Sequence, residues 1–106
     1  MEKKVYKKLV RDRIPCIIRE GGALPTTRTL KGKEFSAALN EKLVEEVEEF
    51  LTSSDIEELA DIYEVMLAIL HDRDIPFAEF EAIRRKKAFE RGAFTEKIFL
   101  VSVEEQ

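Results

Sequence analysis

The sequence has 106 residues, the size of one domain, and 38% of them are charged, well above the quarter that is typical of globular proteins. The lone Cys16 excludes an internal disulfide, and no apolar stretch is long enough to span a membrane or to form a signal peptide. These features predict a cytoplasmic protein with a single domain over residues 1–106 and no membrane partner.

The charges are unevenly distributed along the chain. Residues 1–33 carry ten Lys or Arg against three acids, residues 34–81 carry two against fifteen, and residues 82–106 carry six against four. The acidic middle would repel a nucleic acid backbone, which argues against a nucleic acid polymer as partner. The basic flanks either bind phosphate while the centre binds a metal ion, or neutralise the centre within the fold. Composition leaves both open.

The N-terminal part predicts only short elements. Residues 3–10 are basic and compatible with a strand. Asp12 and Pro15 then predict a brief helix that ends at Gly21 and Gly22.

Two amphipathic helices are predicted to follow. The first covers residues 34–51, where apolar residues recur at helical spacing, and Thr52 and Ser53 interrupt it. The second opens with a capping box at Ser54 and runs to about residue 72. The apolar stripe of the first helix consists of Leu39, Leu43, Val47 and Phe50.

A third long helix should begin at Pro76 and end before Gly92, with proline in its first turn and glycine just past its end. Residues 97–103 are rich in β-branched and aromatic side chains and are predicted to pair as a strand with residues 3–10. The predicted fold class is therefore mainly α, with one short two-stranded pairing of the terminal segments.

Two acidic motifs lie on the first two long helices, and each is a doubled acid followed by a further acid three residues on. At about 100° per residue, Glu46 and Glu49 lie about 60° apart on one side of their helix, and Glu58 and Asp61 have the same relation on theirs. Glu46 and Glu58 border the apolar stripes, so they are predicted to face the neighbouring helix. The motifs read Glu45-Glu46-Val47-Glu48-Glu49 and Glu57-Glu58-Leu59-Ala60-Asp61.

Carboxylates that face each other repel, and a divalent cation would remove that repulsion. Mg²⁺ prefers oxygen ligands and typically joins carboxylates to substrate phosphates. The alternative is that these glutamates are solvated helix surface, and the residues alone leave both open.

The motifs Glu46-x-x-Glu49 and Glu58-x-x-Asp61 resemble the paired motif of the all-α nucleoside triphosphate pyrophosphohydrolases, the MazG-like superfamily that includes phosphoribosyl-ATP pyrophosphohydrolase. Residues 8–15, Lys-Leu-Val-Arg-Asp-Arg-Ile-Pro, and residues 91–94, Arg-Gly-Ala-Phe, resemble a small subgroup of predicted house-cleaning phosphohydrolases. The resemblance covers nearly the whole chain. The connection between the acidic motifs, residues 50–57, is shorter than is usual in the superfamily, although it still allows antiparallel helices.

The resemblance implies an antiparallel helical bundle of the MazG-like type that binds Mg²⁺, with Mn²⁺ as an alternative. The implied metal ligands are Glu46, Glu49, Glu58 and Asp61, and Glu45 is the candidate base for the attacking water.

The basic residues are candidate phosphate ligands. Lys87 and Arg91 resemble basic positions of the family that contact substrate phosphates, and Arg84 shares their helical stripe. Lys8 and Arg11 are further candidates, because Lys and Arg are the usual phosphate partners. The alternatives are a solvated stripe and pairing with the acidic middle of the chain.

The predicted activity is Mg²⁺-dependent hydrolysis of a nucleoside triphosphate to a monophosphate and pyrophosphate, as house-cleaning of non-canonical nucleotides. As in the resembled family, a homodimer or homotetramer is expected. Two alternatives are a phosphoribosyl-ATP or dUTP-type pyrophosphohydrolase, and a non-catalytic helical module that binds a basic partner.

Overall fold

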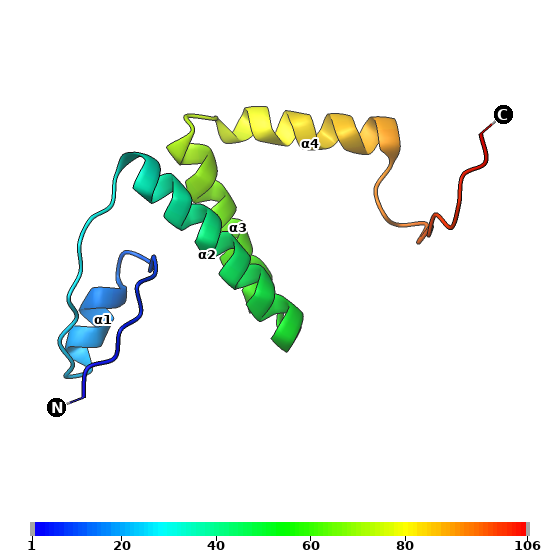
Figure 1. Cartoon of the computed structure of the whole chain (residues 1–106). Coiled ribbons are helices and arrows are strands. Elements are labelled where there is room, and N and C mark those ends of the chain that lie inside the picture. The colour runs from blue at the N-terminus through cyan, green and yellow to red at the C-terminus, as the bar shows by residue number, and fades with distance from the viewer. Residues whose placement is uncertain (1, 106) are drawn as a thin grey trace. The chain divides into compact units, whose positions relative to one another are not determined.

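A computed structural model describes residues 2–105, and its regular structure is entirely helical (Figure 1). The helices are α1 (Ile14–Glu20), α2 (Gly32–Ser53), α3 (Ile56–Asp72) and α4 (Phe77–Arg91). This confirms the predicted mainly α fold class. None of the described helices combines the length and the apolar character that a membrane crossing requires.

The chain divides into two units, Met1–Asp74 and Ile75–Gln106. The first unit contains α1, α2 and α3, and the second contains α4 and the segment that follows it. A single domain over residues 1–106 therefore stays a prediction.

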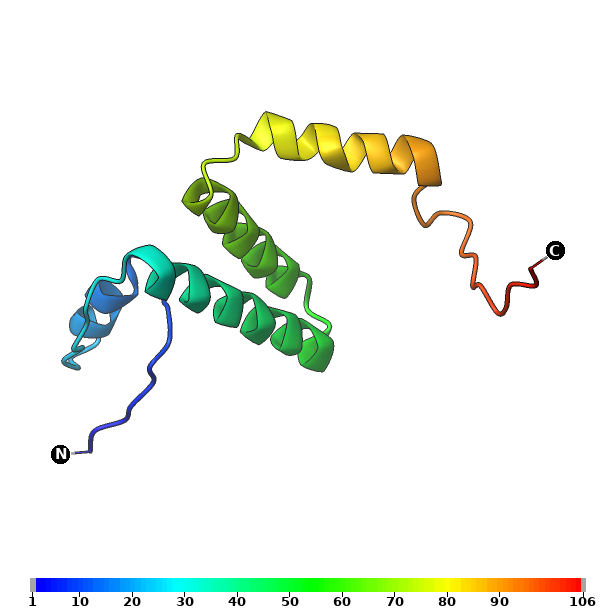
Figure 2. The same cartoon turned by 45° about the horizontal axis from the view of Figure 1, so that its top comes forward.

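Helices α2 and α3 form an antiparallel hairpin, and they lie side by side in both views (Figures 1 and 2). Only Ser54 and Asp55 separate the two helices. Ser54 has a φ of 58°, in the left-handed region, and its N–H donates to the carbonyl of Phe50 at 2.7 Å. The Asp55 carboxylate accepts a hydrogen bond from the N–H of Glu57 at 3.1 Å and so caps α3. Each residue of the turn thus hydrogen-bonds a free backbone group at one helix end: Ser54 at the end of α2 and Asp55 at the start of α3.

The turn differs from the prediction in two ways. Ser54 ends α2 and does not open a capping box, because its left-handed backbone closes the last turn of α2 and leaves capping of α3 to Asp55. Thr52 and Ser53 do not interrupt α2, which continues to Ser53. The Thr52 hydroxyl donates to the carbonyl of Glu48 at 3.0 Å, a bond that lets a threonine remain within a helix.

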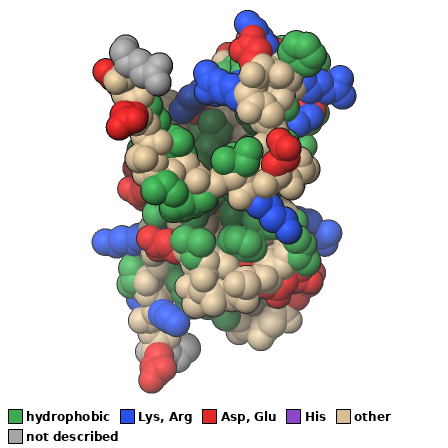
Figure 3. Space-filling model, turned by 90° about the vertical axis from the view of Figure 1, so that its right-hand side faces the viewer, with side chains coloured by type: hydrophobic (Ala, Val, Ile, Leu, Met, Phe, Trp, Pro, Cys, Tyr) green, Lys and Arg blue, Asp and Glu red, His purple; other side chains and the backbone are tan. Residues whose placement is uncertain are grey.

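The small core lies between α2 and α3. Leu39 is 2% exposed and Val65 is 8% exposed, and Leu43 and Phe50 are half-buried. The predicted apolar stripe of α2 therefore does face α3 over most of its length, although Val47 is exposed at its edge. Many other apolar side chains reach the surface, as the green atoms in Figure 3 show for one face.

The predicted strands over residues 3–10 and 97–103 are wrong, because residues 2–105 contain no strand. Lys7 has a φ of 48° and Lys97 a φ of 57°, and a left-handed residue interrupts the extended backbone that a strand needs. A lone two-stranded pair is also marginally stable in water, so nothing compensates for these interruptions.

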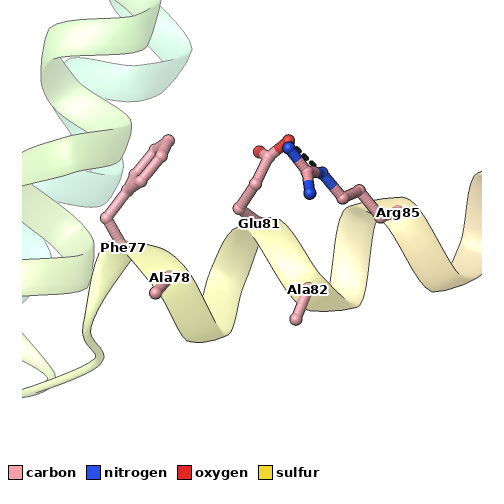
Figure 4. A pocket seen from close by; sticks show the side chains of 5 residues that line it. All are labelled: Phe77, Ala78, Glu81, Ala82 and Arg85. Atoms are coloured by element: carbon pink, nitrogen blue, oxygen red, sulfur yellow. Dashed lines mark ion pairs between the residues drawn. The ribbon is translucent and has the colours of Figure 1, made fainter.

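Helix α4 begins after Pro76 and ends before Gly92, as predicted. Gly92 has a φ of 84°, a conformation that favours glycine. One side of α4 carries a shallow hollow, in which Arg85 folds back toward Glu81 with 3.5 Å between Nε and Oε1 (Figure 4).

Candidate functional site

The helical hairpin carries both acidic motifs to one place. Glu46 lies on α2 before the turn, and Glu58 and Asp61 lie on α3 after it. Because antiparallel helices oppose residues at similar distances from their turn, the motifs face each other. One carboxylate oxygen from each of these three residues lies within 4.8 Å of the other two.

The three carboxylates form what we call the acidic cluster: Glu46, Glu58 and Asp61. The Glu46 side chain is 9% exposed, and Glu58 and Asp61 are half-buried. Oε2 of Glu46 and Oε2 of Glu58 are buried and have no hydrogen-bond partner among the described residues. Buried carboxylate oxygens are normally paired, and unpaired ones are costly. A hard divalent cation, which prefers oxygen ligands, therefore fits this cluster.

Electrostatics at the cluster also favour a bound cation. Burial raises the pKa of Glu46 above its ordinary value, and repulsion from Glu49 adds to this despite the opposing effect of Lys42. Burial also raises the pKa of Glu58, as does repulsion from Glu49, Asp61 and Glu46. Both shifts disfavour the ionised form of these carboxylates, and a bound divalent cation would oppose them.

Glu49 was predicted as a fourth ligand, and its position is different. Its carboxylate is not one of the three that meet within 4.8 Å, and the residue is exposed. It lies close enough to raise the pKa of Glu46 and of Glu58 by repulsion. Glu49 also lines a groove of about 430 Å³ beside the cluster, together with Glu45, Glu48, Thr52, Ser53 and Glu58.

Lys42 is a site residue that the sequence reasoning missed. Its Nζ lies 3.3 Å from Oε1 of Glu45 and 3.2 Å from Oε1 of Glu46, and its side chain is only 15% exposed. Burial alone would lower the pKa of the Lys42 ammonium, but Glu46 and Glu45 raise it above its ordinary value. The i, i+3 and i, i+4 spacing from Lys42 to these two glutamates was a signal that could have identified it.

Two of the predicted basic residues contact the acids. Lys8 Nζ lies 3.3 Å from Oε1 of Glu45, and Arg11 Nη2 lies 2.6 Å from Oδ1 of Asp61. The segment that carries them thus meets both α2 and α3 at the cluster. Burial would raise the pKa of Glu45, but Lys42 and Lys8 together bring it below its ordinary value. Lys8 and Arg11 therefore lie at the site as counter-ions of its carboxylates.

The basic residues of α4 lie in the second unit. Arg84 Nε donates to Oε1 of Glu81 at 3.0 Å, so this arginine is paired on its own helix. Lys87 and Arg91 are exposed and make no ion pair among residues 2–105. Arg84, Lys87 and Arg91 all lie on α4, as predicted, and their spacing of three and four residues gives them a shared face. Their contact with phosphate stays a prediction.

Glu58→Gln should raise the melting temperature of the metal-free protein by a few degrees, because it removes a repelled and partly buried charge. The same change should abolish most of the further rise that Mg²⁺ or Mn²⁺ gives to the wild type. Differential scanning calorimetry with and without the ion measures both effects. Glu57→Gln is the matched control, since Glu57 also lies in the first turn of α3 but outside the cluster. Equal behaviour of the two variants would contradict a cation site at the cluster.

The raised pKa of Glu58 predicts a pH dependence of the metal-free protein. A folded-state pKa above the ordinary value of 4.5 means that the folded protein binds a proton before the unfolded chain does. The free energy of unfolding should therefore increase as the pH falls from neutrality through the raised pKa toward 4.5. The pKa of Glu45 is lowered, so the stability that its ionised carboxylate contributes is lost only at pH values below that window. Urea unfolding at stepped pH should show a weaker dependence in Glu58→Gln, and an unchanged dependence would refute this assignment.

Comparison with known proteins gives one informative alignment. Over 52 residues the chain is 52% identical to an uncharacterized protein of Mycolicibacterium smegmatis (strain ATCC 700084 / mc(2)155). The alignment covers 49% of this chain and 52% of that protein, so the chain spans about half the length of this relative. No protein-family model matches the chain, and no solved structure matches it. The name of the relative states no activity, so any functional assignment must come from the acidic cluster and its surroundings.

Proposed function

We propose that the protein is a divalent-cation-dependent nucleoside triphosphate pyrophosphohydrolase of the MazG-like type. One observation supports this above all: Glu46, Glu58 and Asp61 meet across a helical hairpin, and two of their oxygens are buried without a partner. Mg²⁺ is the proposed ion, with Mn²⁺ as an alternative, because both take carboxylate oxygens.

The surroundings of the cluster favour a polyphosphate as the substrate. Lys8 and Arg11 come from the basic N-terminal segment and lie directly beside the acids. A phosphate chain bound at a metal ion would bring negative oxygens next to these cations, and Lys and Arg are the usual partners of such oxygens. The groove beside the cluster is lined by four glutamates, so a polyphosphate would enter it only together with a divalent cation.

In the proposed reaction, Glu46, Glu58 and Asp61 hold the ion, with Glu49 completing the ligands from the groove. When bound, a divalent ion supplies Lewis-acid activation of phosphoryl oxygens and of water. Glu45 is the proposed base, and its carboxylate is held by Lys8 and Lys42, which bring its pKa below the ordinary value.

The remaining basic residues are proposed to hold the phosphates. Lys8 and Arg11 would do so beside the cluster, and a phosphate-binding role for Arg84, Lys87 and Arg91 on α4 stays a prediction. The products are a nucleoside monophosphate and pyrophosphate.

The proposed substrates are non-canonical nucleotides, and the proposed compartment is the cytoplasm. A phosphoribosyl-ATP or dUTP-type substrate would use the same cluster, so a nucleotide panel must distinguish them. A non-catalytic module would also present exposed acids, but it gives no reason for burying unpaired oxygens of both Glu46 and Glu58.

A homodimer or homotetramer is proposed because α2 and α3 each carry a second apolar stripe. On α2, Val44 and Leu51 lie about 20° apart around the helix. On α3, Ile56 and Tyr63 repeat this relation, and Leu59 lies beside them. All five side chains are at least 41% exposed in the single chain. A helix with apolar residues beyond the stripe that its neighbour covers typically packs against another element.

Purified wild type should release pyrophosphate from one or more nucleoside triphosphates in the presence of Mg²⁺ or Mn²⁺. Asp61→Asn should lower kcat by more than about 100-fold, because loss of a charged ligand should exceed the roughly 10–100-fold effect of losing a residue that only supports one. Coupled pyrophosphate detection and chromatography of the nucleotide products measure this. Glu64→Gln, an exposed glutamate three residues further along α3, is the control and should retain wild-type rates. Absence of hydrolysis across a broad panel, phosphoribosyl-ATP included, would refute the proposed function.

Light scattering should give a mass of two or four times the 12.3 kDa of the chain. Leu51→Asp should shift the protein toward a smaller assembly, because it places a charge in the second apolar stripe of α2. Leu24→Asp is the control, since Leu24 is 92% exposed and lies outside the helices. A monomeric wild type, with its apolar stripes covered only by its own chain, would contradict the proposed assembly.

A further inference from the structure

Lys42 occupies a special place beside the acidic cluster. Its ammonium lies between two carboxylates of its own helix, 3.3 Å from Oε1 of Glu45 and 3.2 Å from Oε1 of Glu46. The spacing of three and four residues fixes this arrangement, because such residues lie on one side of an α-helix. With 15% of its side chain exposed, Lys42 is the least exposed cation among the ion pairs of the described residues.

The two carboxylate oxygens of Glu46 have different surroundings. Oε1 contacts the ammonium of Lys42, and Oε2 is buried without a partner. One oxygen of the same carboxylate lies within 4.8 Å of oxygens of Glu58 and Asp61. One carboxylate therefore joins a filled cation position to a second position with free oxygens. Carboxylates that serve two metal ions about 3.5–4 Å apart are a common feature of sites that cleave phosphate bonds. Here the ammonium of Lys42 already neutralises Oε1 of Glu46 on the side of Glu45.

The charges around the cluster agree with a single further cation. Five carboxylates lie close together, namely Glu45, Glu46, Glu49, Glu58 and Asp61. Three cations pair with them, namely Lys8, Arg11 and Lys42. Two negative charges remain, which one divalent ion would balance. A second divalent ion would bring the group to a net charge of +2 while Lys42 is present, but only to +1 once a neutral residue replaces it.

We propose that Lys42 is a built-in cation that fills one of two cation positions, so that the acidic cluster of each chain takes a single divalent ion. The inference rests on the proposed metal-dependent function and adds the number of ions and the residue that sets it. Lys42 acts here as a positioning residue, because its ammonium holds Oε1 of Glu46 and so fixes the carboxylate that meets Glu58 and Asp61.

The test is the number of Mn²⁺ ions bound per chain without nucleotide, measured from the paramagnetic resonance signal of free Mn²⁺ during titration. Wild type and Lys42→Arg should bind one ion. Lys42→Met keeps the aliphatic stem but frees Oε1 of Glu46 and leaves Oε1 of Glu45 with Lys8 alone, so it should bind a second ion. Lys33→Met, in the first turn of the same helix, is the control for loss of one lysine and should bind one ion.

Two results would overturn the role of Lys42. Two ions per chain in the wild type would show that Lys42 fills no cation position, and this holds whether or not the variants fold. A count of one in folded Lys42→Met and in Lys42→Gln, each checked by circular dichroism, would show that freeing the oxygens creates no second site. Either result leaves the proposed hydrolase intact if the wild type still cleaves nucleotides. No saturable Mn²⁺ binding by any form would instead remove the metal site itself, and the proposed function with it.

Discussion

The central constraint on this protein is the repulsion between carboxylates that two adjacent helices bring together. Glu46, Glu58 and Asp61 converge within 4.8 Å, and Glu46 is almost fully buried. Like charges so arranged destabilise a helical pair. The opposing hydrophobic burial is small, since Leu39 and Val65 are the only buried apolar residues of the described chain. Counter-ions are therefore part of the fold as well as of the site.

The turn between α2 and α3 determines which acids meet. The connection has only two residues, Ser54 in a left-handed conformation and Asp55 as the cap of α3. Such a short connection fixes the position of one helix along the other. The register of the hairpin follows, and with it the convergence of Glu46 with Glu58 and Asp61. A longer connection is not needed to oppose the two motifs, because they already lie close to the turn.

Local sequence patterns predicted much of the hairpin and part of the site. Helical periodicity located α2, α3 and α4, and the wheel position of Glu46 indicated its burial against α3. The strand prediction failed because β-propensity does not reveal a left-handed residue such as Lys7. Lys42 was detectable from its spacing to Glu45 and Glu46, whereas no local rule relates Arg11 to a residue fifty positions away. Such a contact depends on tertiary structure.

The charge pattern suggested either that the basic flank binds phosphate or that it neutralises the acids, and the geometry makes these compatible. Arg11 is paired with Asp61, yet its side chain remains 54% exposed, and that of Lys8 remains 41% exposed beside Glu45. Ion pairs this exposed contribute only about 0–1 kcal/mol, because water screens them. Exchange of a carboxylate for a phosphate oxygen would therefore sacrifice little stability. Lys42, which is far less exposed, lacks this freedom, so the two kinds of cation suit different tasks: one stays with the carboxylates, and the others are available to a ligand.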